Sequence, residues 1–333
     1  MADSLVNADA AQLVAEAEAA AARIGAVRQA IARVVFGQER VVAETLATLL
    51  SGGHGLLVGV PGLAKTKLVE TLSTVLGLSE SRIQFTPDLM PSDILGSEVL
   101  DQAADGGRAF RFIKGPVFSQ LVMADEINRA SPRTQSALLQ AMQEHHVTIA
   151  GIRHDLPAPF HVLATQNPLE QEGTYPLPEA QLDRFLMQID VAYPDRDTER
   201  AILFATTGAE EEKPVAVLEP GELARLQRLV RLFPVGTGVV EAILDLVRGA
   251  RPAKTGSRFA TDIAWGPGPR AAQALMLTVR ARALIDGRLA PSLDDVAALA
   301  EPVLKHRMAM SFEARARGIG VGEVIADLVG RIG

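Results

Sequence analysis

A lysine and a threonine close a short loop of glycine and proline in the first quarter of the sequence. The loop reads Gly59-Val60-Pro61-Gly62-Leu63-Ala64-Lys65-Thr66. An apolar run over residues 55–58 precedes the loop and a helical pattern follows it, so the order is strand, loop, helix. This order points backbone N–H groups and the positive end of a helix into one small volume, which suits a triphosphate. We predict that Lys65 contacts the β- and γ-phosphates and that the Thr66 hydroxyl binds Mg²⁺.

One position of the loop departs from the general phosphate-binding pattern. Ala64 stands where that pattern has glycine, which keeps side-chain atoms away from the phosphates. Alanine is the smallest alternative, and we expect it to fit if the residue has a helical φ. The competing interpretation is an ordinary loop with a solvated lysine. The strand and helix on either side favour phosphate binding.

Two acids follow a second buried apolar run, residues 121–124. They are Asp125 and Glu126. Beside a phosphate-binding loop, Asp125 is predicted to hold Mg²⁺, directly or through water, and Glu126 to polarise the attacking water as general base. An ordinary solvated acidic turn is the alternative, and the neighbouring loop makes it the weaker interpretation.

Three more polar residues could act on a phosphoryl group. Asn167 ends the strand-like run 160–165 and is placed to orient the attacking water, although Asn-Pro is also a common turn signal. Arg184 precedes the last strand-like run, and Arg270 lies in the first turn of a later helix. A guanidinium can neutralise the charge that develops on the equatorial phosphate oxygens. For either arginine a surface ion pair is the ordinary alternative.

The elements that must position these residues alternate between strand and helix. Apolar runs at 55–58, 83–86, 121–124, 160–165 and 186–191 read as buried strands, with helical patterns between several of them. Ser131 before Pro132 reads as the start of a helix. Strand signals stop near residue 194, and the remainder reads as helices. We therefore predict a parallel sheet covered by helices over residues 1–194 and an all-helical second domain over 195–333.

Composition narrows the classes of protein that fit. Hydrophobic residues make up 48% of the 333 residues and aromatic residues only 4%, which suits helices packed on a parallel sheet. The net charge of −7, without a block of lysine or arginine, argues against strong nucleic-acid binding. With no cysteine, the chain has neither disulfides nor thiolate metal sites. We expect a cytoplasmic protein without a membrane span, because no apolar run is long enough and the start lacks a basic segment.

The motifs between residues 36 and 271 resemble those of the MoxR family of AAA+ ATPases in their order and in their amino-acid sequences. Besides the loop at 59–66, where this family also has alanine, the segments that carry the resemblance are Phe36-Gly37-Gln38, Gln84-Phe85-Thr86-Pro87-Asp88-Leu89-Met90-Pro91-Ser92-Asp93, Ala124-Asp125-Glu126-Ile127-Asn128-Arg129-Ala130, Ala164-Thr165-Gln166-Asn167-Pro168, residues 172–185 and Gly266-Pro267-Gly268-Pro269-Arg270-Ala271. The resemblance implies an α/β P-loop NTPase core of the AAA+ type followed by a helical lid.

The resemblance also implies roles for individual residues. Gly37 and Gln38 match the segment beside the adenine, and Asn167 resembles the first sensor. Arg184 resembles the arginine finger that acts on a neighbouring subunit, and Arg270 the second sensor on the lid, which responds to the γ-phosphate. ATP and Mg²⁺ are the implied ligands. Two hairpin-type insertions are implied, one at about 87–115, with strands at 97–101 and 109–114 around Gly106 and Gly107, and one at 146–158.

Three functions follow from these observations. The resemblance implies an ATPase in a homo-oligomeric ring, a hexamer, that acts as a chaperone in the maturation of a protein client, including metal or cofactor insertion. A separate protein with a von Willebrand factor A domain is its implied partner. A nucleic-acid motor is the second function, disfavoured by the acidic balance of charge. The third is a nucleotide-switched scaffold with little hydrolysis, which predicts that Glu126→Gln barely changes turnover.

Overall fold

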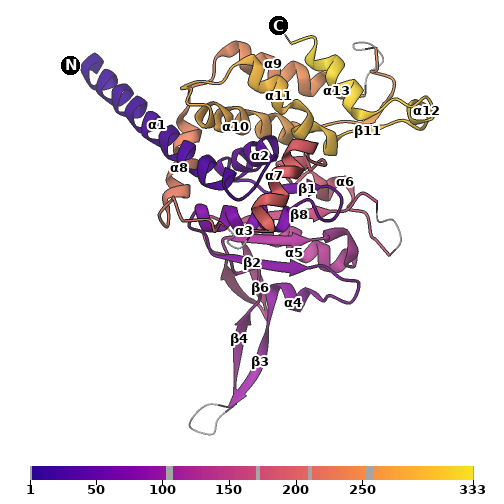
Figure 1. The fold of residues 1–333 in the computed structure, drawn as a ribbon. Helices are drawn as coiled ribbons and strands as arrows, with labels where there is room; N and C mark the ends of the chain where they lie inside the picture. Colours follow the sequence, from indigo (N-terminus) through magenta and orange to yellow (C-terminus); the bar gives the residue numbers. More distant parts are fainter. Residues whose placement is uncertain (1, 103–107, 170–172, 209–211, 253–257, 333) are drawn as a thin grey trace.

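Five parallel strands form the central sheet of the computed structural model, which describes residues 2–102, 108–169, 173–208, 212–252 and 258–332 (Figure 1). The strand order is β2-β5-β8-β1-β9. The bounds are β1 Gly55–Val58, β2 Glu80–Gln84, β5 Leu121–Asp125, β8 His161–Gln166 and β9 Met187–Asp190. Each neighbouring pair is parallel, so the carboxyl ends of the strands meet at one edge of the sheet. The predicted parallel sheet is confirmed.

The edge strand β2 differs from the others in its burial. All five residues of β5 are buried, as expected for a strand covered on both faces. In β2 only Ile83 is buried, while Arg82 and Gln84 are exposed. The predicted strand at 83–86 therefore lies about three residues too late, because a half-covered edge strand lacks the continuous apolar run that the prediction relied on.

Two layers of helices cover the two faces of the sheet. On one face, Leu57, Met123 and Leu163 share a hydrophobic cluster with helices α1, α2 and α3 and with the lid. On the other face, Leu56 and Val122 pack with α4, α5 and the second insertion. The helices of the core are α1 Ala2–Ala32, α2 Glu39–Leu50, α3 Lys65–Val75, α4 Pro91–Leu95, α5 Pro132–Glu144 and α6 Glu179–Leu182. Ser131 caps α5 by accepting from the Thr134 N–H, as the Ser-Pro pair predicts.

Both predicted insertions contain antiparallel hairpins. Strands β3 (Gly96–Gln102) and β4 (Arg108–Lys114) form a ribbon that projects away from the body of the molecule (Figure 1). Gly106 and Gly107 lie outside the described residues. Strands β6 (His146–Ile149) and β7 (Ile152–Asp155) form the second hairpin. The ring of Phe112 stacks on His154 with centroids 4.1 Å apart, so the two insertions touch.

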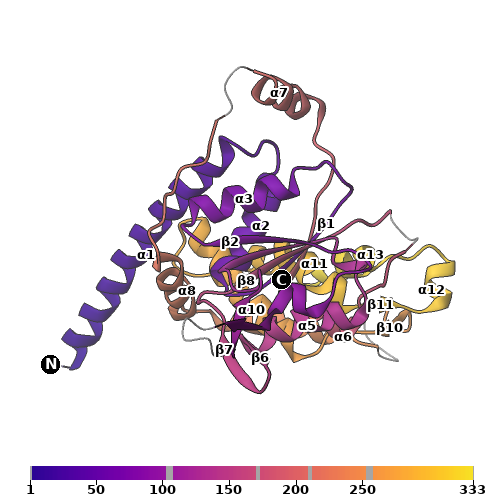
Figure 2. The ribbon, with the colours of Figure 1, turned by 90° about the horizontal axis from the view of Figure 1, so that it is seen from below.

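The second half of the chain is mainly helical, although not all-helical as predicted. Its helices are α7 Arg196–Thr206, α8 Glu222–Leu232, α9 Thr237–Gly249, α10 Pro269–Ile285, α11 Leu293–Leu304, α12 Phe312–Ala316 and α13 Val321–Val329. Strands β10 (Ile263–Trp265) and β11 (Ala309–Met310) add a short antiparallel ribbon, too short to leave a pattern in the sequence. Helix α7 stands apart from the other helices in the view of Figure 2. The domain boundary near residue 194 stays a prediction.

Among the described residues, no helix combines the length and apolar character needed to cross a membrane.

Candidate functional site

The phosphate-binding loop joins the end of β1 to the first residue of α3. The Gly59 N–H donates to the Gln166 carbonyl (3.1 Å), which ties the loop to the end of β8. A Cβ at Gly59 would lie 2.6 Å from the Val191 carbonyl oxygen, so the loop begins where only glycine fits. Lys65 is the first residue of α3, and the loop therefore sits at the positive end of that helix.

The backbone at Ala64 has left-handed geometry, with φ +55° and ψ +22°. We expected alanine to fit with a helical φ. The structure corrects this expectation, because the conformation of Ala64 is left-handed. A left-handed φ costs a residue with a Cβ roughly 1–2 kcal/mol. Glycine in the general pattern therefore serves the backbone as well as the space around the phosphates.

Lys65 folds back over its own loop. Its Nζ donates to the carbonyl oxygens of Gly59 and Val60, the latter at 2.9 Å. Partial burial lowers the pKa of Lys65, and the nearby charges of Asp125 and Glu126 act in the opposite direction. A phosphate entering the loop would offer this ammonium group charged acceptors in place of neutral carbonyls.

Asp125 ends β5 and both of its carboxylate oxygens have partners. Thr165 Oγ1 donates to Oδ1 (2.6 Å), and Arg82 Nη2 donates to Oδ2 (2.5 Å). The Glu126 N–H in turn donates to Thr165 Oγ1 (2.9 Å). One hydroxyl on β8 therefore holds both Asp125, at the end of β5, and the backbone of Glu126, the next residue.

Glu126 adopts a left-handed φ of +55°, which turns its side chain out of the strand. Its Oε2 accepts from Gln84 Nε2 and from Arg129 Nη1, both at 2.9 Å. The carboxylate is thus oriented by the edge strand and by the 3-10 turn η1 (Ile127–Arg129).

Asn167 forms a turn and also lies beside the two acids. Its Oδ1 accepts from the Leu169 N–H (3.1 Å), which is the turn that an Asn-Pro pair favours. The residue is also buried and lines the cavity with the acids. Because Oδ1 is engaged, a contact with water or phosphate would use the side-chain NH₂ group.

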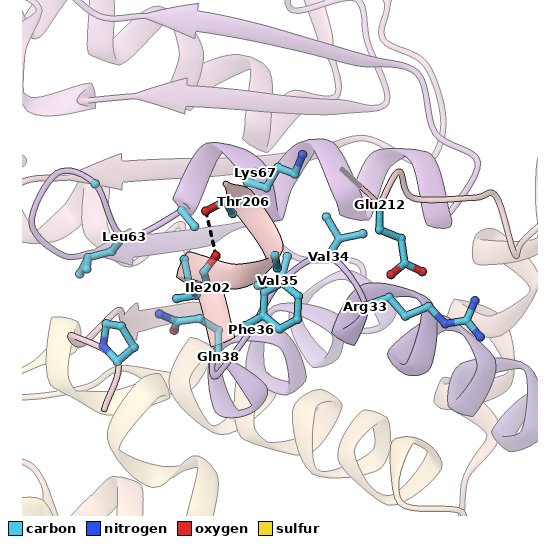
Figure 3. Close-up of a pocket in the computed structure, with 14 residues that line it drawn as sticks. Arg33, Val34, Val35, Phe36, Gln38, Leu63, Lys67, Ile202, Thr206 and Glu212 are labelled. Carbon is cyan, nitrogen blue, oxygen red and sulfur yellow. Dashed lines mark hydrogen bonds between the residues drawn. The ribbon is translucent and has the colours of Figure 1, made fainter. Parts of the chain in front are cut away.

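Two cavities meet on either side of the phosphate-binding loop. A cavity of about 460 Å³ is lined by residues 61–67, Arg82, both acids, Thr165 and Asn167. A second, mainly apolar cavity of about 420 Å³ shares three loop residues and Lys67 of α3 with the first and is bounded by Phe36, Gln38 and α7 (Figure 3). Gly37 lies beneath α7, where a Cβ would lie 2.2 Å from Thr198. The pair of cavities has the size and chemistry for a nucleotide, with the base on the apolar side.

Arg184 and Arg270 line a different cavity, of about 170 Å³, and neither lines the cavity with the acids. Arg184 Nη1 donates to the Leu139 carbonyl of α5 (2.6 Å). Arg270 lies 3.5 Å from Asp183, which also accepts from Arg307 Nε (2.8 Å). The structure therefore brings the two predicted arginines together, on a surface separate from the phosphate-binding loop.

Sequence reasoning missed four side chains around the acids. They are Arg82, Gln84, Arg129 and Thr165. Arg82 and Gln84 left a signal, because polar residues two apart on a strand lie on one face. Arg129 and Thr165 lay inside motifs quoted above, but their contacts cross between elements.

The residues present suit the ligands that the resemblance implies. Lys65 and the N-terminus of α3 supply positive charge for phosphates. The hydroxyl of Thr66 and the carboxylate of Asp125 are oxygen ligands of the kind that Mg²⁺ binds together with substrate phosphates and water.

Comparison with known proteins agrees with this geometry. Residues 54–187 match the "ATPase family associated with various cellular activities (AAA)", and residues 256–328 match the "AAA lid domain". The chain is 42% identical to Chaperone MoxR1 of Mycobacterium tuberculosis over 93% of its own length and 82% of that protein. It is 33% identical to Protein MoxR of Paracoccus denitrificans, covering 87% and 89% of the two chains. A crystal structure from Cytophaga hutchinsonii matches with a TM-score of 0.88 and 35% identity, over 99% of both chains.

Proposed function

Because the chain belongs to the MoxR family of AAA ATPases, we propose that it hydrolyses ATP with Mg²⁺ and couples hydrolysis to the remodelling of a protein client. The observation that carries this proposal is the division of the candidate site between two surfaces. The loop, Asp125 and Glu126 line one cavity, and Arg184 and Arg270 line another. A complete site therefore needs a second subunit.

Within one subunit, each side chain has a task in hydrolysis. Bound MgATP supplies the γ-phosphoryl group and the metal charge that stabilises its transfer. Lys65 and the loop N–H groups hold the phosphates, while Thr66 and Asp125 hold the metal. Glu126 orients the attacking water and accepts its proton, and the NH₂ group of Asn167 fixes that water or the γ-phosphate.

The neighbouring subunit completes the site with its arginines. Arg184 neutralises charge on the transferred phosphoryl group, and Arg270 on the same surface contacts the γ-phosphate from the neighbour. This places Arg270 across the interface from the nucleotide that it senses. A head-to-tail contact of two different surfaces closes into a ring, for which we propose six subunits.

The remodelling function rests on family membership and on the relative named a chaperone. Maturation of a protein complex, with metal or cofactor insertion as one form, is the proposed outcome. A separate protein with a von Willebrand factor A domain is the proposed partner, and the cytoplasm is the proposed location.

Mixing two inactive variants tests the shared site. Lys65→Ala removes the phosphate contact but keeps the arginines, whereas Arg184→Ala keeps the loop. We expect each variant alone to lose hydrolysis by about 10³. In an equal random mixture, about a quarter of the interfaces pair an intact loop with an intact arginine, and we expect turnover to recover to about that fraction.

Phosphate release measures turnover, and light scattering of the same samples reports co-assembly. Arg153→Gln, which removes an exposed ion pair to Asp155 on the second hairpin, is the matched control and should keep wild-type turnover. Co-assembled mixtures without recovered turnover would contradict a shared site. Wild-type turnover of Arg184→Ala alone would contradict the role of that residue.

A further inference from the structure

Arg82 already holds the carboxylate that the metal needs. Its Nη2 lies 2.5 Å from Asp125 Oδ2, and only 13% of the Asp125 side chain is exposed. Thr165 occupies the other oxygen, so both oxygens of this carboxylate have donors. The guanidinium is the ion-pair partner of this largely buried carboxylate.

Arg82 also lines the cavity that contains the phosphate-binding loop and Thr66. A divalent cation bound to Asp125 and Thr66 would therefore face the guanidinium at short range. Two positive charges that share one carboxylate repel each other, and the repulsion is strong where the surroundings exclude water.

From this geometry we propose that Arg82 competes with Mg²⁺ for Asp125, holding the carboxylate in the metal-free state and leaving it when the metal binds. Arg82 is then a positioning residue that sets how much Mg²⁺ the site requires. The inference rests on the proposed function, because the metal enters as part of MgATP.

The position of Arg82 allows it to leave. It lies on the edge strand β2, and 47% of its side chain is exposed, so the guanidinium can turn towards solvent. Its Nη2 also donates to Gln84 Oε1 (3.2 Å), which gives the side chain a second partner on the same strand. Gln84 donates in turn to Glu126. Arg82 and Gln84 therefore link Asp125 to Glu126, the proposed general base, through a chain of hydrogen bonds.

The test measures how binding of a fluorescent ATP analogue depends on Mg²⁺ concentration. Arg82→Gln keeps polar atoms on β2 but removes the charge. We expect its half-saturating Mg²⁺ concentration to fall about fivefold below that of the wild type, the size expected for a half-exposed ion pair. Arg82→Lys keeps the charge without the planar guanidinium and should fall between the two.

A second measurement needs no nucleotide. Mg²⁺ alone should raise the melting temperature of Arg82→Gln more than that of the wild type, because the variant removes the ion-pair partner that competes for Asp125. Arg153→Gln, the exposed arginine used above, is again the matched control and should behave as the wild type in both measurements.

The outcomes separate this inference from the proposed function. An unchanged or higher Mg²⁺ requirement in Arg82→Gln, with analogue binding intact, would overturn the competition and leave the ATPase proposal standing. A wild-type protein that binds no nucleotide would instead overturn the proposed function. If Arg82→Gln does not fold, an unchanged Mg²⁺ requirement in Arg82→Lys would overturn the inference.

Discussion

At the scale of single residues, the loop departs from the general pattern at one position. Ala64 holds a left-handed backbone at the start of α3, where its Cβ adds strain. Strain of this kind persists where the surrounding structure fixes the conformation, and such positions cluster at binding sites. The neighbouring Gly62, at φ +83°, carries no such cost.

Replacing Ala64 by glycine should relieve that strain. We expect Ala64→Gly to raise the free energy of unfolding by about 1 kcal/mol, since the removed strain exceeds the added freedom of the unfolded chain. Ala64→Val should lower it, because a β-branched side chain fits a left-handed φ poorly. Urea unfolding without nucleotide is the measurement. Equal stability of all three proteins would show that the backbone at this position relaxes without cost.

The predicted site residues that line one cavity belong to local patterns. Lys65, Thr66, Asp125 and Glu126 follow directly from a strand, a loop and the first turn of a helix, and the structure places them around one cavity. Thr165 joins the two acids across neighbouring strands. Such a contact depends on sheet order, which the alternation of strands and helices leaves undetermined.

At the scale of elements, two glycines allow the ribbon β3–β4 to leave the body of the protein. Gly96 begins β3 with φ +93°, and Gly115 follows β4. A Cβ on Gly115 would lie 2.3 Å from the Ile94 carbonyl oxygen and 2.5 Å from the Gly96 nitrogen. Backbone approaches backbone here, so no flexible side chain can move aside. The sequence predicted the strands of this ribbon, whereas the tight base shows only in three dimensions.

Gly115→Ala should therefore force the base of the ribbon apart. We expect a loss of about 2 kcal/mol in the free energy of unfolding, as for other overpacked sites. Nucleotide affinity should stay within about twofold, because the substitution lies outside the cavity and acts on packing alone. Urea unfolding and calorimetry measure the two effects.

Gly238→Ala provides a matched control for this substitution. It lies in α9, and a Cβ there would meet nothing within 4 Å. This variant should be at least as stable as the wild type, since alanine favours a helix. Wild-type stability of Gly115→Ala would contradict the tight base.

At the scale of the whole molecule, lid and core share one hydrophobic cluster. Apolar side chains of the sheet, of α1 to α3 and of the lid helices all belong to it. Polar contacts cross the same boundary, because Gln227 of α8 donates to the Leu49 carbonyl (2.8 Å) and to His161 Nε2 (2.9 Å). The predicted domain boundary near residue 194 rests only on the point where strand signals stop along the sequence. The sequence could not show this packing, because apolar periodicity does not identify the partner of a face.

Two buried histidines beside this boundary should make stability depend on pH. Burial lowers the pKa of His54 to about 3 and that of His161 to about 4, and nearby histidines act in the same direction. Hydrogen bonds fix both rings as neutral. His54 Nδ1 accepts from the Val162 N–H, so its Nε2 carries the proton and donates to the Met142 carbonyl. A second proton on His54 would place two donors face to face.

The unfolded chain takes up protons on these histidines below a pH of about 6.5, whereas the folded chain does not until its lower pKa values are reached. Stability should therefore be full above pH 6.5 and fall as the pH decreases towards 4, by about 1.4 kcal/mol for each pH unit and each histidine. Urea unfolding between pH 7.5 and 5 measures this slope.

His54→Asn should be less stable throughout but have a shallower slope, because asparagine keeps a donor and an acceptor and does not titrate. The slope separates titration from packing, since a packing defect lowers stability equally at every pH. A wild-type protein equally stable at pH 7.5 and 5 would show that these rings take up protons in the folded chain as readily as in the unfolded one.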